Sequence, residues 1–164
     1  MVSETEMIKK VIDHAVLKSI HLKSSTSNIV LPPNFVTPDL SKVEIDYKFS
    51  HVFEREAKLL FSFVAIEVIG ILSAEGKANN PNMIIDNDKL FSCHSVFVAT
   101  YSVNADLNGD ECEAFTKTNA LFNVYPYLRE HVNSEFTKMG LLGIYLPLLK
   151  PTKTNGEAAS QEMK

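Results

Sequence analysis

The chain has no tryptophan, two cysteines and six glycines among its 164 residues. Cys93 and Cys112 do not have the spacing of a metal-binding motif, so we expect reduced thiols and no metal site. No stretch matches the glycine-rich GxxxxGK loop that binds nucleotide phosphates. We therefore expect a protein without a cofactor.

Charge of one sign is not concentrated anywhere, and the formal net charge is −4. The absence of a Lys/Arg cluster argues against nucleic acid and against an anionic membrane surface as partners. The opening MVSETEMIKK has no apolar core, which excludes a secretory signal there. The longest apolar run, residues 59–72, contains Glu67 and is too short to cross a bilayer. We expect one cytoplasmic domain with no direct membrane insertion.

The first half of the chain alternates with a period of two. In KVEIDYKFS, residues 42–50, every second side chain is apolar and the intervening ones are polar. This pattern predicts a half-buried antiparallel strand. Residues 15–25, 57–72 and 89–103 favour three more strands.

The strands at 59–72 and 89–103 are apolar on both faces, whereas one face of an antiparallel sheet is usually solvated. Two explanations remain open from the residues alone. The strands are a well-packed interior pair, or other subunits or a ligand complete the second face.

The second half has helical spacing. ECEAFTKTNALFNVY, residues 111–125, is helix-like, and proline is tolerated in the first turn of a helix. We therefore expect a second, main helix to begin at Pro126 and to end at the cap residue Gly140. The following LLGIYLPLLKP is apolar but too irregular for a strand. Residues 151–164 are polar, and we expect a disordered tail.

Candidate catalytic and metal sites are weak. Ser92, Cys93 and His94 are adjacent, but neighbours on a strand point to opposite faces, so Cys93 is best explained as a core residue. DLNGDE, residues 106–111, departs from a calcium loop in its glycine position and favours a turn before a helix. We expect Arg129 and Glu130 to form a structural pair. We expect no enzyme activity.

Residues 120–149, ALFNVYPYLREHVNSEFTKMGLLGIYLPLL, resemble the corresponding region of the SecB protein-export chaperones. The similarity rests on the aromatic-Pro-Tyr-x-Arg-Glu string at 125–130, on Gly140 and on the apolar segment after it. The resemblance implies an α+β fold, with a four-stranded antiparallel sheet and a broken main helix packed on one face. It also implies that residues 1–150 form a SecB-like domain assembled as a homotetramer, a dimer of dimers.

The implied function is that of an ATP-independent chaperone, or holdase, which binds unfolded or aggregation-prone polypeptides in apolar grooves. The residues expected to bind such clients are Phe61, Phe97, Leu141, Leu142, Ile144, Tyr145, Leu146, Leu148 and Leu149. The residues of the main helix expected in the oligomer interface are Pro126, Tyr127, Leu128, Val132 and Phe136.

The chain departs from the SecB pattern in two places. A polar segment follows LPLLKP where the family continues into a second long helix. Family members that dock on the export ATPase SecA carry a Cys-Glu pair on a late strand, and this chain has Cys93 followed by His94. The partner is therefore left open between SecA and an antitoxin, as in SecB-like chaperones that accompany toxin–antitoxin pairs. A rival class is a carrier that holds a small apolar ligand between sheet and helix.

We expect four subunits in solution, because the apolar surface exceeds what one chain of this length can cover. Burial of a further ~1,000 Å² would contribute roughly 25 kcal/mol before the costs of association. Light scattering at micromolar concentration should give the mass of a tetramer. The mass of a monomer would contradict this expectation and favour the carrier.

Overall fold

The computed structural model describes residues 3–30, 40–78, 88–141 and 144–149. Along the chain, its elements are α1 (Glu4–His14), β1 (Ala15–Ile29), β2 (Leu40–Glu54), β3 (Leu59–Leu72), α2 (Ala74–Ala78), β4 (Lys89–Val103), α3 (Gly109–Phe115), a π-helical segment (Thr116–Ala120) and α4 (Leu121–Lys138).

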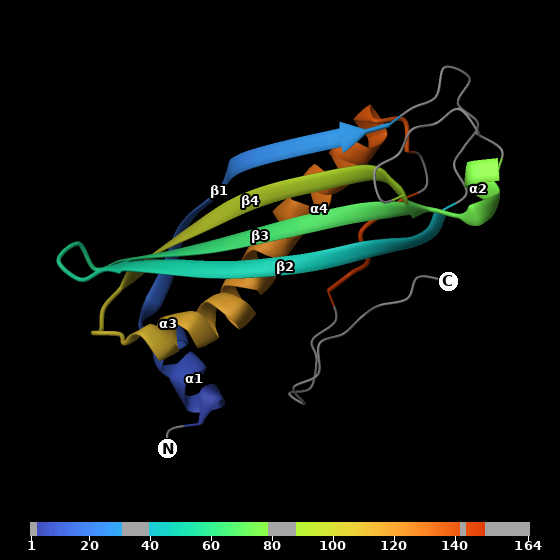
Figure 1. Cartoon of the computed structure of the whole chain (residues 1–164). Helices are drawn as coiled ribbons and strands as arrows, with labels where there is room; N and C mark the ends of the chain where they lie inside the picture. The colour runs from blue at the N-terminus through green and yellow to red at the C-terminus, as the bar shows by residue number, and fades with distance from the viewer. Residues whose placement is uncertain (1–2, 31–39, 79–87, 142–143, 150–164) are drawn as a thin grey trace.

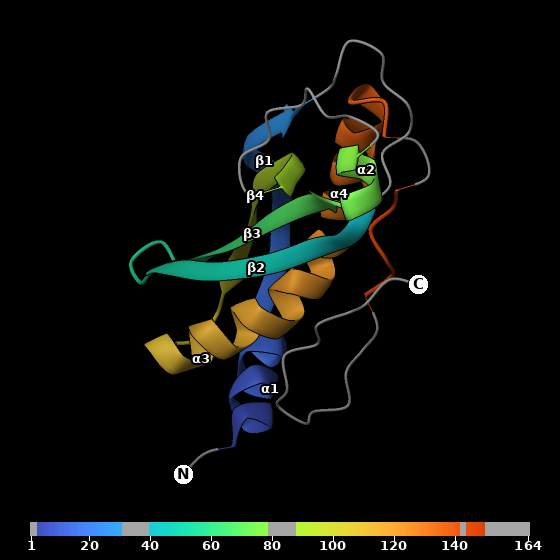
Figure 2. The same ribbon diagram turned by 45° about the vertical axis from the view of Figure 1, so that its right-hand side comes forward.

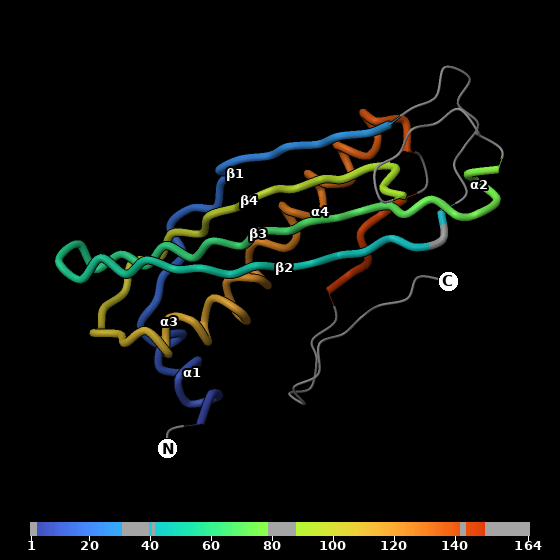
Figure 3. Tube along the Cα trace, in the orientation of Figure 1, coloured from blue at the N-terminus to red at the C-terminus, as the bar shows by residue number. Residues whose placement is uncertain are grey.

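The four strands form one antiparallel sheet in the order β1-β4-β3-β2, so β1 and β2 are the edge strands (Figure 3). The main helix α4 lies across one face of this sheet (Figure 1). We call this face the inner face and the opposite one the outer face. The predicted α+β fold, with four antiparallel strands and a helix on one face, is confirmed.

The inner face is the core of the molecule. On β3, all the even-numbered residues from 60 to 72 are buried and the odd-numbered ones are half-buried. The buried residues of β3 face α4. On this side of the helix, buried apolar residues recur at every fourth position and form a ridge: Val124, Leu128, Val132 and Phe136. The ring of Phe136 meets that of Phe91 edge-on, with the centroids 5.1 Å apart. Sheet and helix are therefore held together by apolar packing.

Gly70 makes room for Phe91, its cross-strand partner on β4. A Cβ atom at position 70 would lie 2.1 Å from a ring carbon of Phe91. A glycine on β3 therefore allows a large aromatic ring to pack on the inner face near one end of the sheet.

The predicted start of the main helix at Pro126 is wrong. Pro126 is the sixth residue of α4, and the irregularity lies upstream in the π-helical segment Thr116–Ala120. The backbone at Phe115, Ala120 and Leu121 is right-handed helical, so one helical path runs from α3 into α4. Pro126 is tolerated because it faces solvent, where water can bind the carbonyl group that lacks its helical donor.

Helix α1 was not anticipated from the sequence. Ser3 caps its first turn, with the Glu6 side chain bonded back to the Ser3 backbone nitrogen at 2.9 Å. The helix docks on α3 through the buried Val11 and an ion pair between Lys10 and Glu111, whose atoms are 2.7 Å apart. A helix this short depends on such tertiary contacts for its stability.

The outer face carries no helix in the described part of the chain, as Figure 2 shows. Along β3 it presents half-buried apolar residues, including Phe61 and Phe63. The Lys23 ammonium lies 4.6 Å from the centre of the Phe63 ring and shields it in part. The strands are thus apolar on both faces as predicted, and only the inner face is covered by helix. No helix among the described residues is long and apolar enough to cross a membrane.

Replacement of Pro126 by alanine should stabilise the subunit. Alanine restores the missing backbone donor and favours a helix interior by about 3 kcal/mol over proline. Proline also restrains the unfolded chain, and the loss of this restraint reduces the gain in stability by about 0.4–1 kcal/mol. We expect the free energy of unfolding in urea to rise by about 2 kcal/mol. Ser134→Ala, at another exposed position of α4, should raise the free energy of unfolding by only a few tenths of a kcal/mol. A loss of stability in Pro126→Ala would show that the proline shapes the helix.

Candidate functional site

We call residues 141–149, which follow α4, the crossover, and its described residues 144–149 turn back along the helix. Gly140 has a positive φ of 77° and ends the helix, as predicted, and the Leu141 nitrogen donates to the Phe136 carbonyl at 2.9 Å. The crossover then lies beside α4 on the side of the edge strand β2, where Ile144 and Leu149 pack on the core.

Three polar side chains of α4, spaced four residues apart, hold the crossover. Tyr125 donates its hydroxyl hydrogen to the Pro147 carbonyl. The Arg129 Nε donates to the Leu146 carbonyl at 2.8 Å, and the Asn133 side-chain oxygen accepts from the Leu146 nitrogen at 3.1 Å. Arg129 is therefore bound to the crossover, and the expected pairing with Glu130 is not formed.

The crossover residues predicted to bind clients fall into three groups. Leu141 and Leu146 are buried and belong to the core, and Ile144 and Leu149 are half-buried. The side chains of Tyr145 and Leu148 are exposed, at 61% and 68% of their accessible surface. Leu142 lies outside the described residues. Among the described residues of the crossover, Tyr145 and Leu148 are thus the exposed apolar side chains.

The two phenylalanines predicted beside the crossover lie on opposite faces of the sheet. Phe97 is buried on the inner face, with its ring centre 5.9 Å from that of His131. Phe61 is on the outer face, away from α4, since its neighbour Ser62 points inward to Thr116. The structure therefore does not bring Phe61 and Phe97 together with the exposed crossover residues.

The edge of β2 lies next to the crossover, and sequence reasoning missed it. From Val43 to Glu54, β2 pairs with β3 without a register shift, and among the described strands it has no neighbour on its other side. The other edge strand, β1, has two register shifts in its pairing with β4. Bulges disturb an edge and protect it from further pairing. β2 therefore offers the more regular row of free backbone donors and acceptors.

A cavity of about 300 Å³ lies between β2 and the junction of α3 with the π-helical segment. Its lining residues are Phe49, Ser50, His51, Glu113 and Thr116. The buried Thr116 hydroxyl, at the beginning of the π-helical segment, is 2.8 Å from that of Ser62. A signal in the sequence was available, because His51 occupies an inward position of β2 where the alternation calls for an apolar residue.

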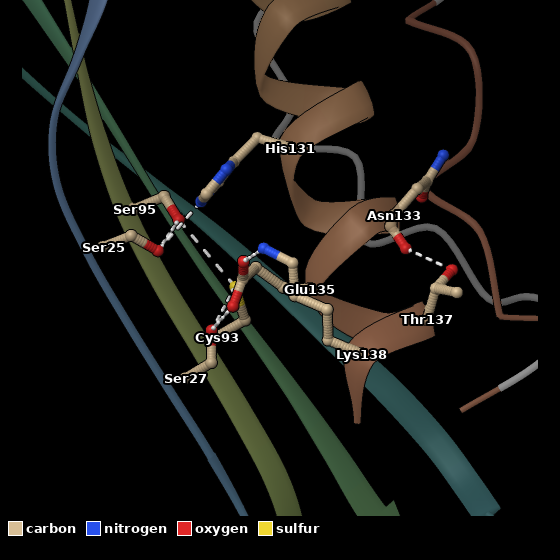
Figure 4. A network of polar contacts seen from close by, with 9 residues as sticks. All are labelled: Ser25, Ser27, Cys93, Ser95, His131, Asn133, Glu135, Thr137 and Lys138. Carbon is tan, nitrogen blue, oxygen red and sulfur yellow. Dashed lines mark hydrogen bonds and ion pairs between the residues drawn. The ribbon is translucent and has the colours of Figure 1, made fainter. Parts of the chain in front are cut away.

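The opposite flank of α4 meets β1 through polar contacts (Figure 4). The His131 Nε2 is 2.9 Å from the Ser25 hydroxyl, and Ser27 donates to a Glu135 carboxylate oxygen at 3.0 Å. Cys93 is buried beside Ser27, and His94 is exposed on the other face, as predicted for neighbours on a strand.

The contact between Ser25 and His131 does not form a catalytic triad in the described part of the chain. A serine is activated when a third group orients the histidine. The Glu135 carboxylate, one helical turn further, is bound to Ser27 and Lys138 instead. We interpret these contacts as the attachment of β1 to the helix.

Like the crossover residues, the residues predicted for the oligomer interface include both buried and exposed side chains. Leu128, Val132 and Phe136 are buried against the sheet of their own subunit, which corrects their assignment to an interface. Pro126 and Tyr127 are exposed, Tyr127 at 54% of its surface. Phe122, which sequence reasoning missed, is a further exposed aromatic residue on α4.

The fold is similar to that of a SecB-like chaperone. The solved structure is the Mycobacterium tuberculosis Rv1957 SecB-like chaperone in complex with a ChAD peptide from the Rv1956 HigA1 antitoxin. The match has a TM-score of 0.70 and 14% identity and covers 90% of this chain and 98% of that one. The resemblance inferred from the sequence is thus confirmed at the level of the fold.

The remaining comparisons give one weak structural match. A Streptococcus agalactiae protein of unknown function matches with a TM-score of 0.35 and 11% identity, over 82% of this chain and 97% of that one. Neither protein-family models nor curated protein sequences match the chain.

The Glu135 contacts should make stability depend on pH. The pKa of Glu135 is lowered from its ordinary value of 4.5, chiefly by the hydrogen bond from Lys138 and also by that from Ser27. A lowered folded-state pKa means that the stabilisation is present above about pH 4.5 and is lost as the pH falls through the folded value. In thermal melts, Glu135→Gln should have a lower Tm than wild type at pH 7, and this difference should narrow as the pH falls below 4.5. The solvent-facing Glu130→Gln should change Tm little across this range. A gap that stays constant with pH would contradict the assignment.

Proposed function

We propose that this chain is an ATP-independent chaperone of the holdase type, which binds extended segments of unfolded polypeptides. The observation that carries the proposal is the match in fold to a SecB-like chaperone solved with an antitoxin peptide. That neighbour's partner is itself a polypeptide segment, so the same class of ligand is the natural candidate here.

The client site that we propose combines the β2 edge with the exposed part of the crossover. An extended chain can add to a free strand edge through backbone hydrogen bonds, whatever its sequence. Apolar side chains of the client would then rest on Tyr145 and Leu148, which are exposed on the crossover. Each apolar side chain buried in this way contributes roughly 1.5–3 kcal/mol before ordering costs. Several weak contacts of this kind allow both binding and release without a nucleotide.

We further propose that the exposed side of α4 joins subunits into the homotetramer. Phe122, Pro126 and Tyr127 form an exposed group there that includes two aromatic residues. Aromatic residues are enriched in the buried centres of interfaces. Such an interface leaves the crossover and the β2 edge available to clients.

For the client we favour an accessory role, with an antitoxin as one possibility, over dedicated export through SecA. His94 is exposed at the position where the SecA-docking members carry an acid. A cytoplasmic location fits either role. The carrier alternative is not favoured, because the described apolar side chains between the central strands and α4 form one packed core, and the cavity beside β2 is lined largely by polar residues.

The purified protein should slow the aggregation of a denatured model substrate without ATP, as followed by light scattering. The double variant Tyr145→Ser and Leu148→Ser should lose most of this protection, because it removes two exposed apolar side chains while leaving the core intact. A wild-type protein that protects no unfolded substrate would overturn the proposed function.

The matched control is the double variant Ile12→Ser and Val16→Ser, which removes two other exposed apolar side chains, on α1 and β1. It should protect as well as wild type. Equal losses in the two double variants would point to general surface hydrophobicity and would contradict the crossover site.

A further inference from the structure

The cavity beside the π-helical segment combines an aromatic wall with a carboxylate. Phe49 and His51 come from the inner face of β2, Glu113 comes from α3, and Thr116 begins the π-helical segment. π-Helical turns within α-helices occur frequently at functional sites. None of the client-binding residues predicted from the sequence lies in this cavity.

The cavity continues the proposed client site along β2. Tyr125 binds the Pro147 carbonyl of the crossover and contacts Tyr47 of β2. The ring of Tyr47 is in turn stacked with that of Phe49, at a centroid distance of 6.5 Å. A polypeptide lying along β2 past the crossover would thus bring its next side chains to the mouth of the cavity.

The groups in the cavity select for a flat cation. The pKa of Glu113 is lowered, mainly by the hydrogen bond and charge of Lys117, so its carboxyl group is ionised at neutral pH. Lys117 is itself about half exposed and can move aside into solvent. The Thr116 hydroxyl is engaged with Ser62, which leaves the Glu113 carboxylate, the His51 imidazole and the Phe49 ring among the lining groups for a ligand. A guanidinium group stacks on aromatic rings and donates two parallel hydrogen bonds to a carboxylate.

We infer that this cavity is an anchoring pocket for one arginine side chain of a bound polypeptide, with Glu113 as its counter-charge and Phe49 as its stacking surface. The inference rests on the proposed function, since it assumes a polypeptide client on β2. It adds a preference to that function: clients with an arginine beside an apolar stretch bind more tightly than clients without one.

The test uses two fluorescein-labelled, unstructured peptides of twelve residues that differ at one position. Each has a leucine-rich half followed by either arginine or citrulline, which has nearly the same shape and no charge. By fluorescence anisotropy, the wild-type protein should bind the arginine peptide about tenfold more tightly, as expected for a charge-assisted bidentate contact. Glu113→Gln should reduce this ratio to about one, whereas Glu130→Gln on the solvent side of α4 should keep it.

Lys117→Gln separates the pocket from a general effect of charge. Lys117 competes for the Glu113 carboxylate, so its removal should raise the arginine preference above the wild-type ratio. A uniform electrostatic effect of the protein's negative charge would instead be shared by Glu113→Gln and Glu130→Gln. Thermal melts of each variant check that the fold is retained.

Equal affinities of wild type for the two peptides would overturn the arginine pocket while leaving the chaperone function in place. A peptide with tyrosine at the same position that binds more tightly than the arginine peptide would also overturn it, in favour of an aromatic anchor. Failure to bind any peptide, together with failure to protect a denatured substrate, would overturn the proposed function itself.

Discussion

The packing of one helix on a four-stranded sheet is the constraint on which the rest of the structure depends. An α-helix with its side chains is about 10–12 Å wide. Four strands about 4.8 Å apart span roughly 14 Å between the axes of the outer two, and their side chains extend further. The ridge from Val124 to Phe136 covers the central strands, and the flanks under β1 and β2 need other partners.

The two flanks are completed by different chemistry. On the β1 side, Ser25 and Ser27 reach His131 and Glu135 through hydrogen bonds. On the β2 side, the crossover fills the gap with buried leucines and ties its backbone to polar residues of α4. On the β1 side, the polar groups are satisfied by hydrogen bonds within the flank itself. On the β2 side, buried and exposed apolar side chains alternate along the crossover, so some of them remain in water. This difference leaves exposed apolar side chains on the β2 side of the molecule.

The proposed client site follows from this asymmetry. The proposed site combines a strand edge that is regular from Val43 to Glu54, two exposed apolar side chains of the crossover and a cavity with a charged wall. Backbone hydrogen bonds tolerate any sequence, apolar contacts favour unfolded chains, and a charged pocket adds a preference. The three together suit a protein that must bind many segments without binding all of them equally.

Periodicity in the sequence determined the secondary structure wherever one physical demand dominated. The alternation in β2 reflects burial of one side of a strand, and Gly140 follows the end of α4 because a positive φ is needed there. The residues of the apolar ridge on α4 were also visible as a repeat. The sequence did not reveal whether this repeat packs on the sheet or on another subunit. A helical pattern indicates that a face is buried, but it does not identify the surface that buries it.

Only the tertiary structure decided which of the apolar residues are available for binding. Leu146 and Leu148 are both leucines of the same apolar segment, yet one is buried and the other exposed. The Leu146 backbone donates a hydrogen bond to Asn133 and accepts one from Arg129, which fixes how the crossover lies on α4. Pro126 was misjudged because local rules treat proline as a helix boundary, whereas the packed ridge on either side of it carries the helix through. Phe49, His51 and Glu113 come together across more than sixty residues of chain, and such proximity is a property of the fold alone.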